Sequence, residues 1–363
     1  MNTFSRYVLK SFLWNFMLLL VGFSALLQLF DLLNNSAEIL QDHLGDMNAV
    51  FEYAALRLPE IVSFLIPFAV LMGALVTLGK MERDNEIMAY KAAGAPYFTV
   101  LWAFLPAVGI VAILHFFVAD LLVPTSIQTL IARDLSVERS KSKNDSKDES
   151  LFVQEGSAVV EAGAVGEDGT ELSHLRIYTR DATGKIVHQI FANDAHYDAA
   201  AEAWHLNDVW TTAVPPDGAA HTEHTDSWDW KTRLTPAEFS DLVEKPQAMT
   251  LGKIWGFVSS TQVGVRPTYF YETWLQKRIA LPVSSILMIL LAAPVAHSLH
   301  RRERGLAVGM TVGFGLGFFY FLTEGLVLSL GESGAVPPFL AAWLPILLFA
   351  AIGGAWLIKQ EGY

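Results

Sequence analysis

Six long apolar runs divide this chain and constrain its fold more than any other feature. Five of them hold the roughly 20 apolar residues that a helix needs to cross a bilayer core of about 30 Å, and the sixth comes close. With only 17% charged residues, the composition also indicates a membrane protein. The runs cover residues 12–33, 61–79, 98–123, 280–296, 306–330 and 339–358, and the fourth is expected to enter the membrane from about residue 271.

The orientation of these spans follows from basic residues in the short loops. The loops at one end, residues 34–60 and 331–338, hold a single basic residue, Arg57. By the positive-inside rule the opposite end, with both termini, is cytoplasmic. The first run is too long for a signal peptide and lacks a small-residue cleavage site, so it is expected to stay as a helix. The basic residues at the cytoplasmic end are Arg6, Lys10, Lys80, Arg83, Lys91, Arg301, Arg302, Arg304 and Lys359.

Residues 125–270 interrupt the apolar pattern and form the predicted outer domain. Strand-like runs such as "LSHLRIYTR" and "AWHLNDVWTTAV" alternate with the turn sequences "EDGT", "DATGK" and "PPDGA". This texture predicts an all-β domain with sandwich-like or jellyroll-like strand spacing. A hydrophilic linker at 137–150 leads into the domain, and a capping box predicts an exit helix that starts at Thr235.

The predicted architecture is therefore a polytopic α-helical membrane protein with an extracytoplasmic all-β domain. Three spans lie in 1–124, the jellyroll-like domain in 125–270, and three further spans in 271–363. The chain holds no cysteine, so the outer domain relies on its sheet core rather than on disulfides.

The residue patterns argue against an enzyme. "GALVTLGKM" at 73–81 looks like a phosphate loop, but its glycines are one residue too far apart and Met81 replaces the magnesium-binding hydroxyl. His221, Glu223 and His224 offer metal-ligand chemistry, yet further ligands are missing, and a solvated turn explains them better. The sequence thus predicts no catalytic residue, no metal and no cofactor. The acidic outer domain also argues against a nucleic-acid partner.

The fifth span carries a glycine at every fourth position. Gly305, Gly309, Gly313 and Gly317 line one narrow ridge of the helix, where another backbone can approach closely. One interpretation is a static seam between two helices. The other is a seam that slides or opens during function, because small residues interlock weakly. The sequence leaves both open.

Ionisable residues gather at the outer ends of the spans. Interfacial snorkelling with mutual ion pairing is one explanation. The other is a polar ring around an outward-opening cavity, in which Lys and Arg bind the phosphates or carboxylates of an anionic lipid. The residues concerned are Asp31, Arg133, Lys277, Arg278 and Glu324.

A short cytoplasmic helix is predicted at 84–95, inside the stretch "MERDNEIMAYKAAGAP" between the second and third spans. Asp84 or Asn85 caps it, Glu86 lies in its first turn, and Gly94 ends it. This helix either rests on the membrane surface or docks into a socket on a soluble protein, which its acidic first turn favours. One side of the helix holds Ile87, Met88, Lys91 and Ala95.

The order of these features resembles one family along nearly the whole chain. The matching stretches are "SRYVLKSFL", "LPEIVSFLIPFAVLMGALVTLGKMERDNEIMAYKAAG", "TRLTP" at the end of the outer domain, "WLQKRIALPVSSILMILLA" and "GAVPPFLAAWLP". They resemble the LptF/LptG family, the permeases of the lipopolysaccharide-export ABC transporter. The last stretch favours the G type of this family over the F type.

The resemblance implies a subunit that extracts lipopolysaccharide from the inner membrane of a Gram-negative bacterium. The implied partners are an LptF-like permease, a dimer of an LptB-like ATPase, an LptC-like single-span protein and an LptA-like periplasmic bridge, which receives the lipid from the jellyroll. By position, Glu86 matches the acidic residue of the family's coupling helix, which seats in a groove of the ATPase. Arg133 and Arg278 match basic positions near the lipid phosphates, and the glycine ridge falls on a gate helix.

The first span departs from the family at its outer end. Where similar permeases often carry lysines, this chain has Gln28, Asn34 and Asn35 beside Asp31. This difference weakens phosphate binding through charge and leads to the hypothesis of a lipid A with different phosphorylation. The alternative function is that of a permease of another ABC system, exporting an amphipathic lipid or a lipoprotein, although such permeases usually have fewer spans.

Overall fold

The fold is described from a computed structural model of the chain, which divides into two compact units. The helical unit comprises Met1–Leu135 and Glu272–Tyr363, and the β unit comprises Ser136–Tyr271. The helical unit thus extends past the boundary expected at residue 124, because the third span continues as a helix. The structure describes residues 3–43, 45–94, 97–133, 135, 151–155, 157–166, 169–181, 184–199, 201–214, 220–232, 234–236, 239, 246–259, 267–301 and 306–361.

The helical unit has, among its described residues, six helical segments that are long and apolar enough to cross a membrane. They coincide with the six predicted runs, so that prediction is confirmed. The segments are Thr3–Gln41, Met47–Arg83, Thr99–Ala132, Thr268–His297, Ala307–Glu332 and Pro338–Lys359. The helices are α1 (Thr3–Asp42), α2 (Met47–Arg83), α3 (Glu86–Ala92), α4 (Tyr97–Phe117), η1 (Val118–Leu122), α5 (Val123–Ala132), α9 (Thr268–Arg301), α10 (Leu306–Glu332) and α11 (Pro338–Glu361).

Helices α1 and α2 are longer than one membrane crossing requires. They contain 40 and 37 residues, against the about 20 that a bilayer core needs. The interpretation of residues 34–60 as a loop was therefore wrong, because both helices continue through this polar stretch. Gly45, with φ +85°, separates them, and the Asp46 carboxylate then accepts a hydrogen bond of 2.9 Å from the Asn48 amide at the start of α2.

A π-helical turn, η1, interrupts the third span between α4 and α5. In this turn the Val123 amide donates to the Val118 carbonyl, five residues back. The next bond of that pattern would come from residue 124, but Pro124 has no N–H group. The Ala119 carbonyl therefore lacks this backbone donor, and the Arg278 guanidinium of α9 donates to it instead.

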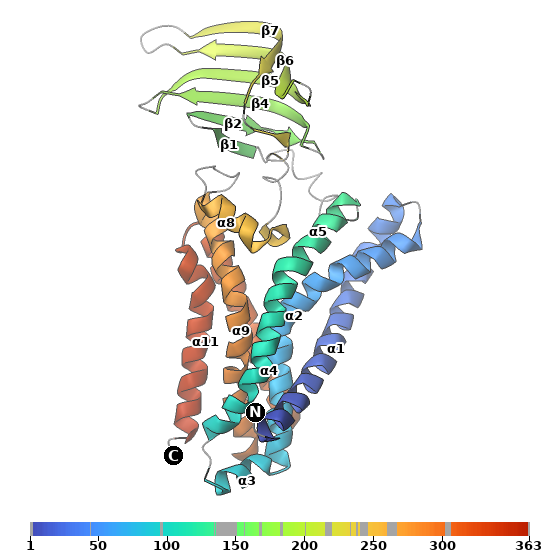
Figure 1. The fold of residues 1–363 in the computed structure, drawn as a ribbon, viewed down its shortest axis with the longest axis vertical. Coiled ribbons are helices and arrows are strands. Elements are labelled where there is room, and N and C mark those ends of the chain that lie inside the picture. Colours follow the sequence, from blue (N-terminus) through green and yellow to red (C-terminus); the bar gives the residue numbers. More distant parts are fainter. Residues whose placement is uncertain are drawn as a thin grey trace. The chain divides into compact units, whose positions relative to one another are not determined.

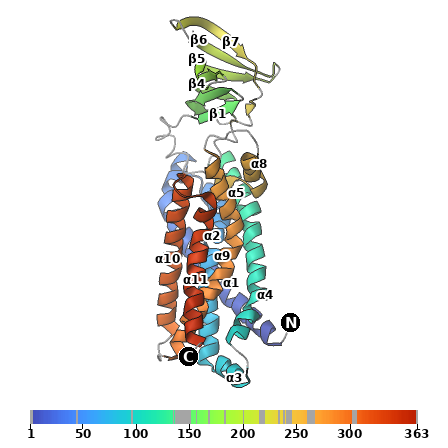
Figure 2. The ribbon, with the colours of Figure 1, turned by 90° about the vertical axis from the view of Figure 1, so that its left-hand side faces the viewer.

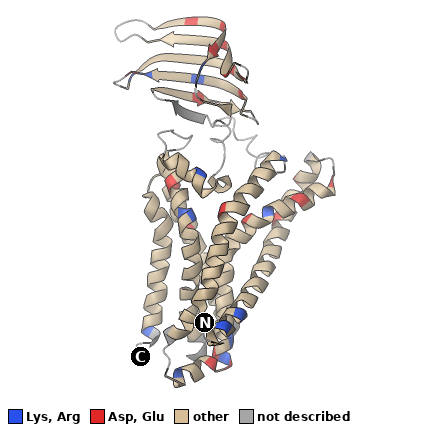
Figure 3. Ribbon diagram, viewed as in Figure 1, with Lys and Arg blue, Asp and Glu red and all other residues tan. Residues whose placement is uncertain are grey.

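Helix α2 lies at the centre of the helical unit (Figures 1 and 2), where it contacts α1, α4, α5 and α10. Its most apolar window is 72% buried, whereas those of α1 and α10 are only 17% and 22% buried. Charged residues gather towards the two ends of the bundle and leave its middle almost free of them (Figure 3). Helices α1 and α10 therefore offer broad apolar faces outside the core of this chain.

The β unit is all-β, as predicted, apart from short helical segments near its C-terminal end. Its strands follow one another as an antiparallel meander in the order β1-β2-β4-β5-β6-β7, with β3 paired to β4. No Greek-key crossover occurs among these described strands. The strands are β1 (Leu151–Glu155), β2 (Ala158–Ala162), β3 (Ala164–Val165), β4 (Glu171–Arg180), β5 (Ile186–Asp198), β6 (Ala203–Ala213) and β7 (His221–Trp230), and the helical segments are η2 (Pro246–Ala248) and α8 (Leu251–Ser259).

The core of the β unit is formed by apolar residues of the sheet and by the segment that follows β7. The buried Trp204 donates its indole N–H to the Leu234 carbonyl at 2.8 Å, and its ring packs edge-on against Phe239. The predicted linker at 137–150 and most of the helix expected from Thr235 lie outside the described residues. The cluster also includes Val160, Leu172, Leu175, Ile177, Leu206 and Val209.

One buried carboxylate shapes the electrostatics of the sheet. Glu161 is 8% exposed and accepts hydrogen bonds from the Arg176 guanidinium at 3.3 Å and the Tyr178 hydroxyl at 3.1 Å. Burial raises the pKa of the Tyr178 hydroxyl above its usual value, and the charge of Glu161 raises it further. The hydroxyl therefore stays protonated and remains a donor at neutral pH.

The strand pairing skips one row of residues across the sheet. His174, Asn193, Asp208 and Asp226 lie in that row, between residues that pair on both sides. His174 and Asp208 have positive φ values of +52° and +56°, a conformation that His, Asn and Asp adopt more readily than most residues. The row thus interrupts the strand pairing across the sheet, and we call it the crease.

Of the histidines considered as metal ligands, His224 contacts this crease. His221 and His224 belong to strand β7, so their interpretation as a solvated turn was wrong. His224 Nε2 lies 2.8 Å from Asp208 Oδ1, which connects β7 to the crease residue of β6. In the part of the chain that the structure describes, no group of three or more potential ligands could hold a metal ion.

We expect Asp208→Val to loosen β6 and β7. A β-branched side chain at positive φ costs about 1–2 kcal/mol, and the variant also loses the contact with His224. Hydrogen–deuterium exchange of the full chain should show faster exchange of the β6 and β7 amides, whereas Asp208→Asn, which tolerates positive φ and can still bond His224, should exchange like the wild type. Equal exchange in both variants would show that the crease imposes no such requirement.

Candidate functional site

The short helix between α2 and α4 is α3, which is seven residues long, Glu86–Ala92, and lies within the predicted range. Asp84 ends α2, and Asn85 stands at the N-cap position with φ +58° but makes no side-chain capping bond. The capping prediction was therefore wrong in its mechanism: the left-handed Asn85 turns the chain between two closely spaced helices. Gly94, with φ +88°, follows the end of α3, as expected for a residue that stops a helix.

Helix α3 has an inner and an outer side. Ile87 is only 1% exposed and belongs to the core of the helical unit, whereas Met88 is 51% exposed. Glu86 is half-buried, and its Oε1 accepts a hydrogen bond of 2.9 Å from the Tyr7 hydroxyl of α1. Asp84 and Met88 therefore face outward, while Ile87 anchors the helix to its own chain.

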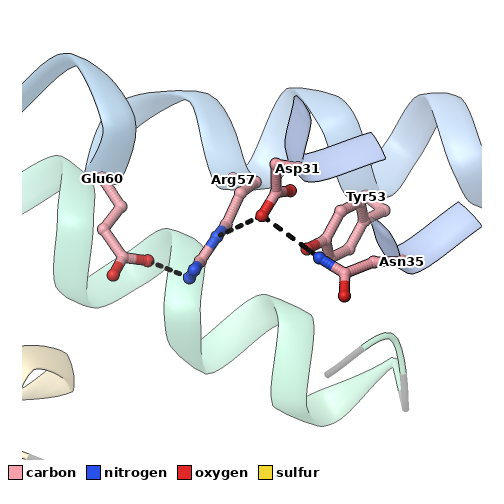
Figure 4. Close-up of polar contacts among 5 residues, drawn as sticks. All are labelled: Asp31, Asn35, Tyr53, Arg57 and Glu60. Carbon is pink, nitrogen blue, oxygen red and sulfur yellow. Dashed lines mark hydrogen bonds and ion pairs between the residues drawn. The ribbon is translucent and has the colours of Figure 1, made fainter. Parts of the chain in front are cut away.

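The outer ends of α1 and α2 share a polar cluster (Figure 4). Arg57 lies between two carboxylates, with its Nε 3.7 Å from Asp31 Oδ1 and its Nη1 paired with Glu60. The Asn35 amide donates to Asp31 at 3.2 Å and to the Tyr53 hydroxyl at 3.1 Å. Asp31 is thus held by the protein itself, as the ion-pairing interpretation expected.

Near this polar cluster, α1 also holds polar side-chain atoms that are buried and have no hydrogen-bond partner within the described chain. They are Ser24 Oγ, both amide atoms of Gln28 and Asp31 Oδ2. Ser24, Gln28, Asp31 and Asn35 are spaced by four, three and four residues, so they form one polar stripe of α1. The stripe holds no basic residue: three of its members are neutral hydrogen-bonding groups, and the fourth is Asp31.

The remaining predicted cations and acids also have partners inside the helical unit. Arg133, at the end of α5, pairs with Glu52 of α2, and Lys277 Nζ of α9 lies 3.1 Å from Glu324 Oε1 of α10. Arg278 is only 6% exposed and donates to the Ala119 carbonyl. Of the three cations, Arg133 is the most accessible, with 57% of its side chain exposed.

The glycine ridge of α10 packs against α2. Gly309, Gly313 and Gly317 are buried, whereas Gly315 is exposed, and Gly305 lies outside the described residues. A Cβ atom added at Gly317 would lie 2.8 Å from Phe68 Cδ2, and one at Gly313 would lie 2.0 Å from Leu75 Cδ1. The ridge therefore forms a close helix–helix seam, as both interpretations of it required.

An aromatic surface connects this seam to α1. Phe68 of α2 packs against Phe23 of α1 at 5.2 Å between ring centroids and against Phe314 of α10 at 5.4 Å. Phe64 and Phe314 remain 56% and 53% exposed. One face of the helical unit thus presents aromatic side chains from α1, α2 and α10 to its surroundings.

Comparison with known proteins agrees with this architecture. A family model described as "Lipopolysaccharide export system permease LptF/LptG" matches residues 6–359, which include both units. The chain belongs to the LptF/LptG family. Its relatives include the lipopolysaccharide export system permease proteins LptG of Haemophilus influenzae, 26% identical over 370 residues and 99% of each chain, and of Escherichia coli K12, 23% identical over 360 residues and 98% of each chain.

Family membership places the chain among multi-pass proteins of the inner membrane that serve as transporter components. Several residues that contact α3 or hold the helices of the bundle together could not be found from the sequence. Tyr7 reaches Glu86, Glu52 pairs with Arg133, and Gly73 of α2 comes so close to α1 that an added Cβ would lie 3.1 Å from Phe16 Cα. The polar stripe of α1 could have been found from the sequence, because its polar residues recur at helical spacing within an apolar run.

Proposed function

We propose that this chain is the G-type permease subunit of an ATP-driven system that extracts lipopolysaccharide from the inner membrane. The family match over both the helical unit and the β unit carries this proposal. ATP hydrolysis belongs to a partner subunit, an LptB-like ATPase dimer. The β unit delivers the lipid to an LptA-like periplasmic bridge, and an LptC-like single-span protein completes the complex.

The proposed orientation has α3 and both chain termini in the cytoplasm. In support, the two termini and α3 lie at the same end of the helical bundle (Figures 1 and 2). Basic residues at that end, including Lys10, Arg83 and Lys91, agree with the positive-inside rule. In this orientation, α3 is available to a cytoplasmic ATPase.

The proposed contact with the ATPase uses the outer side of α3. Met88 is exposed there, and Asp84 is exposed at the end of α2 just before it; an apolar and an acidic side chain together suit a groove on a soluble protein. Glu86 contributes its second carboxylate oxygen, since Oε1 accepts the bond from Tyr7. Gly94 ends the helix and allows the chain to turn back to α4.

The proposed lipid-binding face is the aromatic surface of α1, α2 and α10, completed by an LptF-like permease. Its exposed Phe64 and Phe314 suit acyl chains. Among the cations, Arg133 is best placed to bind a lipid phosphate, because it is half-exposed and would exchange Glu52 for the phosphate. Arg278, Lys277, Asp31 and Glu324 would act mainly by holding the helices around this face.

Reconstitution tests the proposal directly. The chain, co-expressed with an F-type permease, its ATPase and its single-span partner, should release lipopolysaccharide from liposomes only when ATP is hydrolysed. Glu86→Ala should lower both this release and the lipid-stimulated ATPase activity at least several-fold while the permease stays folded. ATP-dependent release of a lipoprotein but not of lipopolysaccharide would contradict the proposed substrate, and normal coupling in Glu86→Ala would contradict the role of Glu86.

A further inference from the structure

The first turns of α1 contact α3 through two pairs of side chains. The Tyr7 hydroxyl donates to Glu86 Oε1 at 2.9 Å, and the rings of Phe4 and Tyr90 stack with their centroids 4.4 Å apart and their planes 15° apart. Phe4 and Tyr7 are three residues apart, and Glu86 and Tyr90 are four apart. Phe4 and Tyr7 therefore lie on one face of α1, Glu86 and Tyr90 lie on one face of α3, and these two faces meet.

Each helix is also anchored in the core of the helical unit by an apolar residue next to these pairs. Val8 of α1 and Ile87 of α3 are 0% and 1% exposed, and both belong to the core of the helical unit. Phe4 and Tyr90 pack against that core from its edge. The contact thus combines a hydrogen bond to a carboxylate with an aromatic stack, at positions beside residues that anchor α1 and α3 in the core of the helical unit.

We infer that Phe4 and Tyr7 join α3 to α1 as one rigid body, and that Tyr7 is a positioning residue for the Glu86 carboxylate. The inference deepens the proposed function and rests on it. A displacement that an ATPase imposes on α3 then moves the cytoplasmic end of α1 directly. Since α1 also carries the polar stripe and one side of the aromatic surface, the movement reaches the lipid-binding face through α1 as well as through α2, which α3 also contacts.

Cross-linking tests whether α1 and α3 stay together. The chain has no cysteine, so Phe4→Cys/Tyr90→Cys gives it its only two thiols, which a short bifunctional thiol reagent can join. We expect the same cross-linking yield in the nucleotide-free and the vanadate-trapped complex, and cross-linked complexes that keep at least half of their ATPase activity and lipid release. A yield that falls severalfold in one state, or activity lost on cross-linking and restored by cleaving the reagent, would overturn the inference. Each single-cysteine variant, treated in the same way, is the control.

The hydroxyl of Tyr7 is tested separately. Tyr7→Phe keeps the ring and removes one partly exposed hydrogen bond, so we expect about a threefold loss of lipid released per ATP hydrolysed. Tyr90→Phe, which keeps the stack with Phe4, should release lipid like the wild type. In Glu86→Gln, the additional effect of Tyr7→Phe should shrink, because the charged partner is already gone.

The outcomes separate this inference from the proposed function. A wild-type complex that fails to release lipopolysaccharide contradicts the proposed function, while the cross-linking yields still decide whether α1 and α3 move together. A wild-type complex that releases the lipid, combined with equal release per ATP in Tyr7→Phe, contradicts the positioning role alone. An equal drop in folded protein, ATPase activity and release in Tyr7→Phe would show a merely structural contact and would also contradict it.

Discussion

Gly317→Ala is expected to destabilise the helical unit by about 1–3 kcal/mol, as overpacking of a close-packed core does. The new Cβ would lie 2.8 and 2.9 Å from two ring atoms of Phe68 and 3.0 Å from Leu71 Cδ2. Phe68 is only 7% exposed, and Phe23 and Phe314 pack on its ring, so the ring has little room to move. The midpoint of thermal denaturation of the purified chain in detergent measures the effect.

Gly315→Ala is the matched control for this variant. Gly315 lies on the same helix, and a Cβ added there would meet nothing within 4 Å. Its stability should equal or slightly exceed that of the wild type, because alanine favours a helix over glycine. If both variants denature at the wild-type temperature, the ridge of α10 does not pack on α2 as described.

Gly317→Ala also separates the two interpretations of the glycine ridge. A static seam predicts lower stability, with transport per folded complex unchanged. A sliding seam predicts that transport per folded complex falls more than stability does, because a methyl group obstructs the movement. Lipid release divided by the amount of folded complex distinguishes the two.

Arg278→Met is expected to lower stability by about 1–3 kcal/mol, because it leaves the Ala119 carbonyl without its side-chain donor. Pro124 supplies no amide hydrogen at the position where the π-helical pattern would need one. The cost should therefore depend on Pro124. Thermal denaturation of the purified chain and binding of lipopolysaccharide are the two measurements.

A double-mutant cycle makes this dependence testable. Pro124→Ala provides a backbone N–H, so Arg278→Met should cost clearly less in that background than in the wild type. Arg278→Lys, which keeps the charge and one donor, should lie between wild type and Arg278→Met. Unchanged stability with weakened lipid binding would instead support the lipid-phosphate contact that family resemblance implies for Arg278.

Much of the architecture could be predicted because its determinants are local. The length and apolar character of the six runs suffice to predict six spans, since a bilayer imposes one minimum length on every helix. Turn sequences and alternation predicted the β unit, and Gly94 marked the end of α3 because only a residue tolerant of positive φ suits that position. The prediction of a loop at 34–60 was wrong because its determinant is not local: polar residues also form helices when a neighbouring helix packs against them.

The candidate sites depended on residues that are far apart in the sequence. The sequence by itself determined where charges, glycines and aromatic residues occur along each helix. Only the tertiary structure decided that Arg278 reaches a carbonyl 159 residues away, that Tyr7 reaches Glu86 across 79 residues, and that the glycine ridge faces α2. The physical reason is that a charged or polar side chain in an apolar environment takes whichever partner packing brings within hydrogen-bond distance, and packing is a property of the whole bundle.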